Sequence, residues 1–130
     1  MKSGVAAGAV AGVVGGIVGV IFGYIGYLAG LYGATPVGIT NYVVSTIVLT
    51  IIFGAIFGSI YSKLHDPIPG KGVSKGLYFG LMIWLIKDIA AGAYIASHNP
   101  SEIAISTALV FVGFFMWITY GPVLGALYKK

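Results

Sequence analysis

The 130-residue sequence contains no cysteine, no arginine and only three acidic residues. Without cysteine the chain has no disulfide, no thiolate metal site and no cysteine nucleophile. Without arginine it lacks the side chain that most often reads base edges, so its seven lysines are better explained by membrane topology than by nucleic-acid binding. We therefore expect no nucleic acid among its partners.

Charged residues are scarce: they make up 8% of the chain, against 58% hydrophobic residues. Soluble domains carry roughly 25% charge, and so few polar side chains cannot cover a water-soluble fold of this size. A helix needs about 20 apolar residues to cross a hydrocarbon core, which leaves room for four crossings. We expect an all-α integral membrane protein, with residues 1–130 forming one four-transmembrane-helix bundle.

Four apolar segments predict the spans, and they cover about residues 4–33, 41–64, 76–97 and 102–128. Polar, Pro and Gly residues separate them. The third segment carries Lys87 and Asp88 near its middle. Insertion scales assign roughly 2.5 to 3.5 kcal/mol to each such residue, which the apolar neighbours largely offset, so we still expect this segment to span.

Lysines outside the spans predict the orientation. They are Lys2, Lys63, Lys71, Lys75, Lys129 and Lys130. With four crossings they all lie on one side of the membrane, and the positive-inside rule places both termini and the central loop in the cytoplasm. We predict that the last five of these lysines contact lipid headgroups.

Each half of the chain pairs two spans around a short external turn with a proline, although the residues of the two halves do not align convincingly. Two spans return the chain to the same side of the membrane. A duplication would therefore be parallel, and the inverted repeat of many transporters is excluded.

The central part of the chain resembles known sequences. The run FGAIFGSIYSKLHDPIPGKGVSKGLYFGLMIWLI, residues 53–86, is similar to stretches of small prokaryotic membrane proteins. The resemblance implies a prokaryotic cytoplasmic membrane as the location and supplies no activity, ligand or site.

Glycines recur along the first segment at alternating spacings of four and three residues. They are Gly12, Gly16, Gly19, Gly23, Gly26, Gly30 and Gly33. This repeat lines one face of a slightly underwound helix, where another backbone can approach closely. The partner is left open: it is the second or fourth segment of the same chain, or the first segment of another copy.

Shorter glycine runs, each spaced by four, occur in or just before the other three segments. They are Gly54 and Gly58; Gly72, Gly76 and Gly80; and Gly121 and Gly125. Such spacing allows close helix packing in membranes. It predicts a tight bundle and favours a homo-oligomer or a complex with other membrane subunits.

Lys87 and Asp88 form the predicted intramembrane charge site. Adjacent residues point in different directions around an α-helix, so we expect each charge to find its own partner. The candidate partners are a charge of a neighbouring subunit or one of seven hydroxyl groups: Thr46, Thr50, Tyr24, Tyr27, Thr107, Thr119 and Tyr120. Two interpretations stay open, a proton or ion relay and a structural charge pair.

The remaining polar residues predict no catalytic chemistry. His65 with Asp66, and His98 with Glu102, offer fewer ligands than zinc requires. The sequence PGKGVSKG lacks the spacing of a phosphate loop. No nucleophile, base and oxyanion arrangement is evident, so we predict no enzyme activity, no metal and no cofactor.

These features together predict a small non-catalytic membrane protein, a structural or accessory subunit of a homo-oligomer or larger membrane complex. Membrane lipids are its other expected partners. The alternative is a small ion channel or proton-coupled transporter that uses Asp88 and Lys87. A dry, packed interior favours the subunit, whereas a path lined by Asp88 favours transport.

Overall fold

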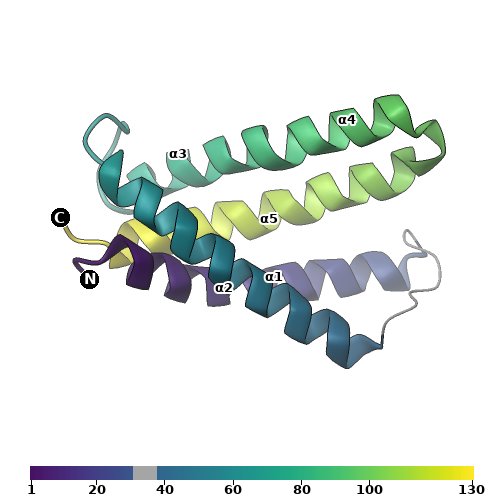
Figure 1. Ribbon diagram of the computed structural model, residues 1–130, viewed down its shortest axis with the longest axis horizontal. Coiled ribbons are helices and arrows are strands. Elements are labelled where there is room, and N and C mark those ends of the chain that lie inside the picture. The colour runs from purple at the N-terminus through teal and green to yellow at the C-terminus, as the bar shows by residue number, and fades with distance from the viewer. Residues whose placement is uncertain (31–37) are drawn as a thin grey trace.

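The computed structural model describes residues 1–30 and 38–130, and the described ranges contain helices and turns but no strand (Figure 1). The elements are α1 Gly4–Leu28, α2 Ile39–Lys63, α3 Val73–Ile83, η1 Trp84–Ile89, α4 Ala90–His98, η2 Pro100–Glu102 and α5 Ile103–Leu127. Here α3, η1 and α4 form one continuous rod. The prediction of an all-helical chain with four helices long and apolar enough to span a membrane is confirmed.

Local signals determine where the helices begin and end. Ser3 caps α1, because its hydroxyl accepts a hydrogen bond from the backbone N–H of Ala6 at 3.2 Å. The helix ends at Leu28, earlier than predicted. Gly30 follows with φ +76°, a left-handed conformation that glycine readily adopts after a helix. Gly33, the predicted end of this segment, lies outside the described residues.

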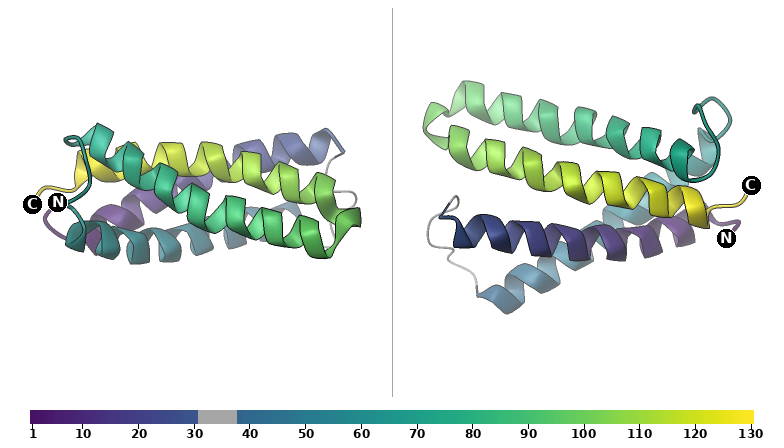
Figure 2. Two further views of the ribbon diagram at one scale, coloured as in Figure 1. Left: turned by 90° about the horizontal axis from the view of Figure 1, so that it is seen from above. Right: turned by 180° about the vertical axis from the view of Figure 1, so that it is seen from behind.

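The rods are arranged as two pairs, α1 with α2 and the α3–α4 rod with α5. Both termini and the connection from α2 to α3 lie at one end of the molecule, which we call the terminal end (Figure 1). The connection from α4 to α5 lies at the opposite end, the far end. The two pairs meet mainly where α1 contacts α5. Seen from behind, α1 and α5 lie close together near the termini and separate toward the far end (Figure 2).

Glycine backbones touch directly where α1 crosses α2. A Cβ placed on Gly8 would lie 2.1 Å from the carbonyl oxygen of Gly54. A Cβ on Gly58 would likewise lie 2.1 Å from the carbonyl oxygen of Gly4. No side chain fits at either position unless the two helices separate.

The crossing of α3 and α5 has the same construction. A Cβ on Gly76 would lie 2.0 Å from the carbonyl oxygen of Gly121, and one on Gly125 would lie 2.2 Å from that of Gly72. Gly80 packs against the backbone of Trp117. Both helix pairs are therefore held at a backbone-to-backbone distance that only glycine permits.

These equivalent contacts align the two halves of the chain. Gly72, Gly76 and Gly80 repeat Gly4, Gly8 and Gly12, while Gly121 and Gly125 repeat Gly54 and Gly58. Residues 53–63, FGAIFGSIYSK, then match residues 120–130, YGPVLGALYKK. The two halves, which the sequence alone left unaligned, therefore pack through corresponding glycines, with α1 corresponding to α3 and α2 to α5.

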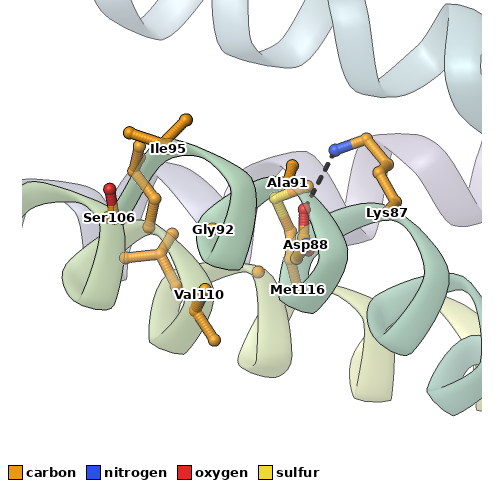
Figure 3. Close-up of a pocket in the computed structure, with 11 residues that line it drawn as sticks. Lys87, Asp88, Ala91, Gly92, Ile95, Ser106, Val110 and Met116 are labelled. Carbon is orange, nitrogen blue, oxygen red and sulfur yellow. Dashed lines mark hydrogen bonds and ion pairs between the residues drawn. The ribbon is translucent and has the colours of Figure 1, made fainter. Parts of the chain in front are cut away.

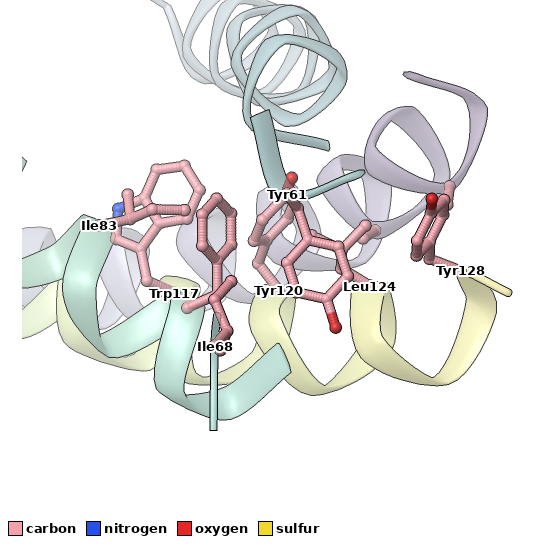
Figure 4. Close-up of a cluster of buried hydrophobic side chains, with 10 residues drawn as sticks. Tyr61, Ile68, Ile83, Trp117, Tyr120, Leu124 and Tyr128 are labelled. Atoms are coloured by element: carbon pink, nitrogen blue, oxygen red, sulfur yellow. The ribbon is translucent and has the colours of Figure 1, made fainter. Parts of the chain in front are cut away.

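A buried cluster, half of it aromatic, fills the bundle toward the terminal end (Figure 4). It includes Tyr61, Ile68, Phe79, Ile83, Trp117, Tyr120, Leu124 and Tyr128. Tyr61 and Tyr128 are equivalent in the two halves, and their rings meet edge to face at 5.6 Å, as expected where a two-fold axis relates the pairs. The Tyr120 hydroxyl joins the pairs by donating to the carbonyl oxygen of Gly54 at 2.7 Å.

Candidate functional site

The predicted packing glycines of α1 mostly face other helices of the same chain. Gly12 and Gly16 face α2, Gly19 faces Met116 of α5, and Gly23 faces Tyr42 of α2. Gly26 is also buried. Of the partners left open by the sequence, the contacts are with the second and fourth segments. Gly30 is exposed after α1, and no atom of the described residues lies within 4 Å of a Cβ placed on it, so its part in packing stays a prediction.

The lysines predicted to contact lipid have different surroundings. Lys63, Lys71 and Lys129 are exposed, and their contact with headgroups stays a prediction. Lys75 was wrongly assigned: it is buried, because the segment after α2 folds over it and the carbonyl oxygen of His65 accepts a hydrogen bond from its ammonium.

Lys130 is exposed and ties the C-terminal residues to the connection after α2. Its ammonium donates to both carboxylate oxygens of Asp66. This hydrogen bonding, together with the lysine charge, holds the pKa of Asp66 below its ordinary value. Since deprotonated Asp66 forms the pair, the tether is present at neutral pH and is lost as pH falls through that lowered pKa.

Lys87 and Asp88 lie together in η1, a π-helical stretch inside the third rod. The Lys87 ammonium donates to Oδ1 of Asp88 at 3.1 Å, so the expectation of separate partners was wrong. The flexible lysine side chain bends back, and the π-helix is wider than the α-helix on which the expectation rested. We call these two residues the charge pair. Single π-helical turns are frequent at functional sites.

Two aromatic rings lie beside the Lys87 ammonium. Its nitrogen lies 5.7 Å from the ring centre of Phe53 and 5.6 Å from that of Trp117, within the range of cation–π attraction. Four of the seven hydroxyl groups proposed as partners donate to backbone carbonyl oxygens instead. Thr50, Thr107 and Thr119 donate to carbonyl oxygens of their own helices, and Tyr120 donates to Gly54. Tyr24 and Tyr27 stack on each other.

Of the two carboxylate oxygens of Asp88, only Oδ1 has a hydrogen-bond partner among the described residues. Its side chain is 14% exposed, and among the described residues no group hydrogen-bonds to its buried Oδ2. Gly113 of α5 makes room for this oxygen, because a Cβ on Gly113 would lie 2.0 Å from it. Sequence reading missed Gly113, whose signal is a lone glycine among the large apolar residues of α5.

A pocket of about 270 Å³ adjoins the charge pair, between the η1–α4 part of the third rod and α5 (Figure 3). Apart from the pair, its wall is apolar except for Ser106. Ser106 is 3% exposed, and its buried hydroxyl has no hydrogen-bond partner among the described residues. Figure 3 shows Ser106 and Ile95 at one end of the pocket and Lys87 at the other. Sequence reading also missed Ser106.

The pocket therefore combines a partly exposed ammonium, a carboxylate with one buried oxygen and a buried hydroxyl, on an otherwise apolar wall. Few polar groups in an apolar cavity are typical of small-molecule sites. Within residues 1–30 and 38–130, no three His, Asp or Glu side chains gather as a metal site would need. In comparisons with known proteins, no family model, no curated protein and no solved structure matches this chain.

Proposed function

We propose that the four long helices cross a prokaryotic cytoplasmic membrane, with both termini and the α2–α3 connection in the cytoplasm. Large apolar side chains on the outside of the bundle support insertion: Ile21 and Ile56 are each 51% exposed and Phe111 is 61% exposed. Extensive apolar surface of this kind is a liability in water and suits acyl chains. The exposed Lys63, Lys71 and Lys129 support the orientation through the positive-inside rule.

Single cysteines test this topology cleanly, because the natural chain has none. A membrane-impermeant maleimide added to intact cells should label Asn99→Cys at the far end. It should label Lys71→Cys at the terminal end only after the membrane is permeabilised. The opposite pattern would reverse the proposed orientation.

We further propose that the protein is a small transporter whose charge pair binds a solute or a proton. The observation that carries this proposal is the half-satisfied Asp88 beside the pocket. Ionisable residues in the middle of a membrane span are costly and usually mark substrate or proton pathways. A purely structural ion pair needs its remaining oxygen hydrogen-bonded to offset burial, and Oδ2 of Asp88 has no such partner among the described residues.

A transporter agrees better with the packing than a channel does. The buried cluster around Tyr61, Trp117 and Tyr128 fills the terminal half of the bundle, so access from the pocket to that side requires movement. Parallel repeats related by an axis along the membrane normal occur in known transporter folds. Here each pair is held by backbone contacts, whereas the pairs meet through side chains such as the stacked rings of Phe22 and Phe115. We propose that the pairs tilt against each other as two rigid units.

Proton flux into liposomes tests the transport proposal. With purified protein and a pH gradient, followed by an entrapped pH-sensitive dye, wild-type liposomes should take up protons faster than empty liposomes. Asp88→Asn should reduce the rate at least tenfold, since the amide cannot exchange a proton with the pocket. The matched control is Asp66→Asn, the same substitution at the exposed terminal end, which should retain wild-type flux. Wild-type flux that equals the empty-liposome rate, or that survives Asp88→Asn, would refute the proposal.

The accessory subunit predicted from sequence remains the second candidate. One observation favours it: the Lys87 side chain is 39% exposed, so an acidic group of a partner subunit could reach its ammonium. The glycines that suggested an oligomer contact helices of the same chain, and oligomerisation stays a prediction. Absent flux, together with a membrane partner that copurifies with wild type and is lost from Lys87→Met, would favour the subunit.

A further inference from the structure

We infer that the pocket beside the charge pair takes a small anion with an apolar body, of the monocarboxylate class. This inference rests on the proposed function, because it names the solute for the same site. Lys87 would hold the anionic head, and the apolar wall between α4 and α5 would cover the body. The argument depends on which polar groups the pocket presents and on the size and chemistry of its wall.

The two members of the charge pair are unequally accessible. The Lys87 side chain is 39% exposed, whereas Asp88 is 14% exposed and its Oδ2 is fully buried against α5. An ammonium has three donors, and Asp88 Oδ1 accepts from one of them. Lys87 therefore has donors left for an incoming anion, while a cationic solute would have to reach a carboxylate oxygen that the protein covers. The site selects for negative charge.

The wall of the pocket selects for an apolar body. Beyond the charge pair it is lined by Ala91, Gly92, Ile95, Leu109, Val110 and Met116, among other apolar residues. A volume of about 270 Å³ is just below the range usual for ligand pockets, so the solute is small. An inorganic anion such as chloride would leave this apolar surface uncovered, whereas a short acyl chain would cover it.

Ser106 supplies an independent indication of a ligand. Its hydroxyl is buried without a hydrogen-bond partner among the described residues. This burial is unfavourable unless a bound solute forms a hydrogen bond with the hydroxyl. It lies at the opposite end of the pocket from Lys87 (Figure 3). A solute whose carboxylate meets Lys87 and whose other end carries a hydroxyl would satisfy both groups.

Equilibrium dialysis of the full-length protein in detergent tests the inference with radiolabelled butyrate and butylamine, which share a four-carbon body and differ in charge. Butyrate should bind, and butylamine should bind at least tenfold more weakly. Butyrate should also change the fluorescence of Trp117, which lies beside Lys87. The 4-hydroxy derivative of butyrate should bind more tightly than butyrate, and Ser106→Ala should remove that difference.

Variants of the charge pair separate binding from misfolding because they should act in opposite directions. Lys87→Met should weaken butyrate binding roughly tenfold or more, the usual effect of losing a charge-assisted hydrogen bond. Lys87→Arg should retain binding. Asp88→Asn should tighten it, because the ammonium loses its competing carboxylate. The double variant Lys87→Met with Asp88→Leu leaves no unpaired charge and should bind butyrate as weakly as Lys87→Met, whereas restored binding would show that Lys87→Met had only destabilised the fold.

Preference for butylamine, butyrate binding unaffected by Lys87→Met, or no butyrate binding by wild type would each overturn the inference. These outcomes are distinct from a failure of the proposed function. Proton flux that depends on Asp88 without butyrate binding would leave a transporter of another solute. Butyrate binding without flux would leave an anion site in a protein that does not transport.

Discussion

Replacing Gly8 with alanine should lower the free energy of unfolding by about 1–3 kcal/mol, the range typical of overpacking a close contact. The new Cβ would lie 2.1 Å from the carbonyl oxygen of Gly54 and 2.7 Å from Cα of Gly58. These are backbone atoms and cannot rotate away, so α1 and α2 would have to separate along their crossing. Unfolding by dodecyl sulfate in mixed micelles, followed by helical circular dichroism, measures the effect.

Gly15→Ala is the matched control, because Gly15 is buried in the same helix as Gly8. A Cβ there would lie 3.4 Å from its nearest neighbour, Cβ of Tyr120, which is ordinary contact. Alanine also favours the helix over glycine by up to about 1 kcal/mol, so stability should stay the same or rise. The crossing of α3 and α5 has the same construction and adds a second expectation. Gly76→Ala should lower the free energy of unfolding as much as Gly8→Ala does. Equal effects at Gly8 and Gly15 would contradict the described crossing.

Replacing Lys87 with methionine should lower the free energy of unfolding by up to about 3 kcal/mol, because it leaves the largely covered carboxylate of Asp88 without its cation. Asp88 is 14% exposed, and Lys87 is the cation with which it pairs. Methionine preserves most of the apolar stem of lysine, so the loss reports on the charge. The reverse variant, Asp88→Leu, should also lower stability, because it leaves the Lys87 ammonium without its carboxylate.

The double variant Lys87→Met with Asp88→Leu distinguishes a charge effect from a packing effect. Replacing both partners by apolar residues of similar size is often neutral or stabilising, so the double variant should be more stable than Lys87→Met alone. The same micelle unfolding experiment, arranged as a double-mutant cycle, gives the coupling energy of the pair. Losses that simply add would show that Lys87 and Asp88 do not depend on each other.

The sequence predicted the helices well because each depends on neighbouring residues. Uninterrupted apolar runs predicted four long helices, and the actual helices begin and end close to the predicted residues. The exception is the end of α1, where Gly30 stops the helix although the glycine repeat suggested continuation. The spacing of the glycines indicates which face of the helix carries small residues. The positive φ at a single residue decides where the helix ends.

The candidate site was predicted only in part. Lys87 and Asp88 were identified because charges inside an apolar run are conspicuous. Their direct pairing was missed, since it depends on a local π-helix that the α-helical period did not indicate. Ser106 and Gly113 were missed as well. They become part of the site only because this stretch of α5 packs against η1 and α4.

The sequence by itself determined that this protein has four long apolar helices. It also showed that their faces carry glycines and that one apolar run contains the charged residues Lys87 and Asp88. Helix hydrogen bonds are local, so composition and spacing suffice for that conclusion. Only the tertiary structure decided that Gly8 meets Gly54 while Gly76 meets Gly121, and that the two halves therefore pack through corresponding glycines. It also placed Lys87, Asp88 and Ser106 around one pocket, because helix crossings bring together residues that are distant in the chain.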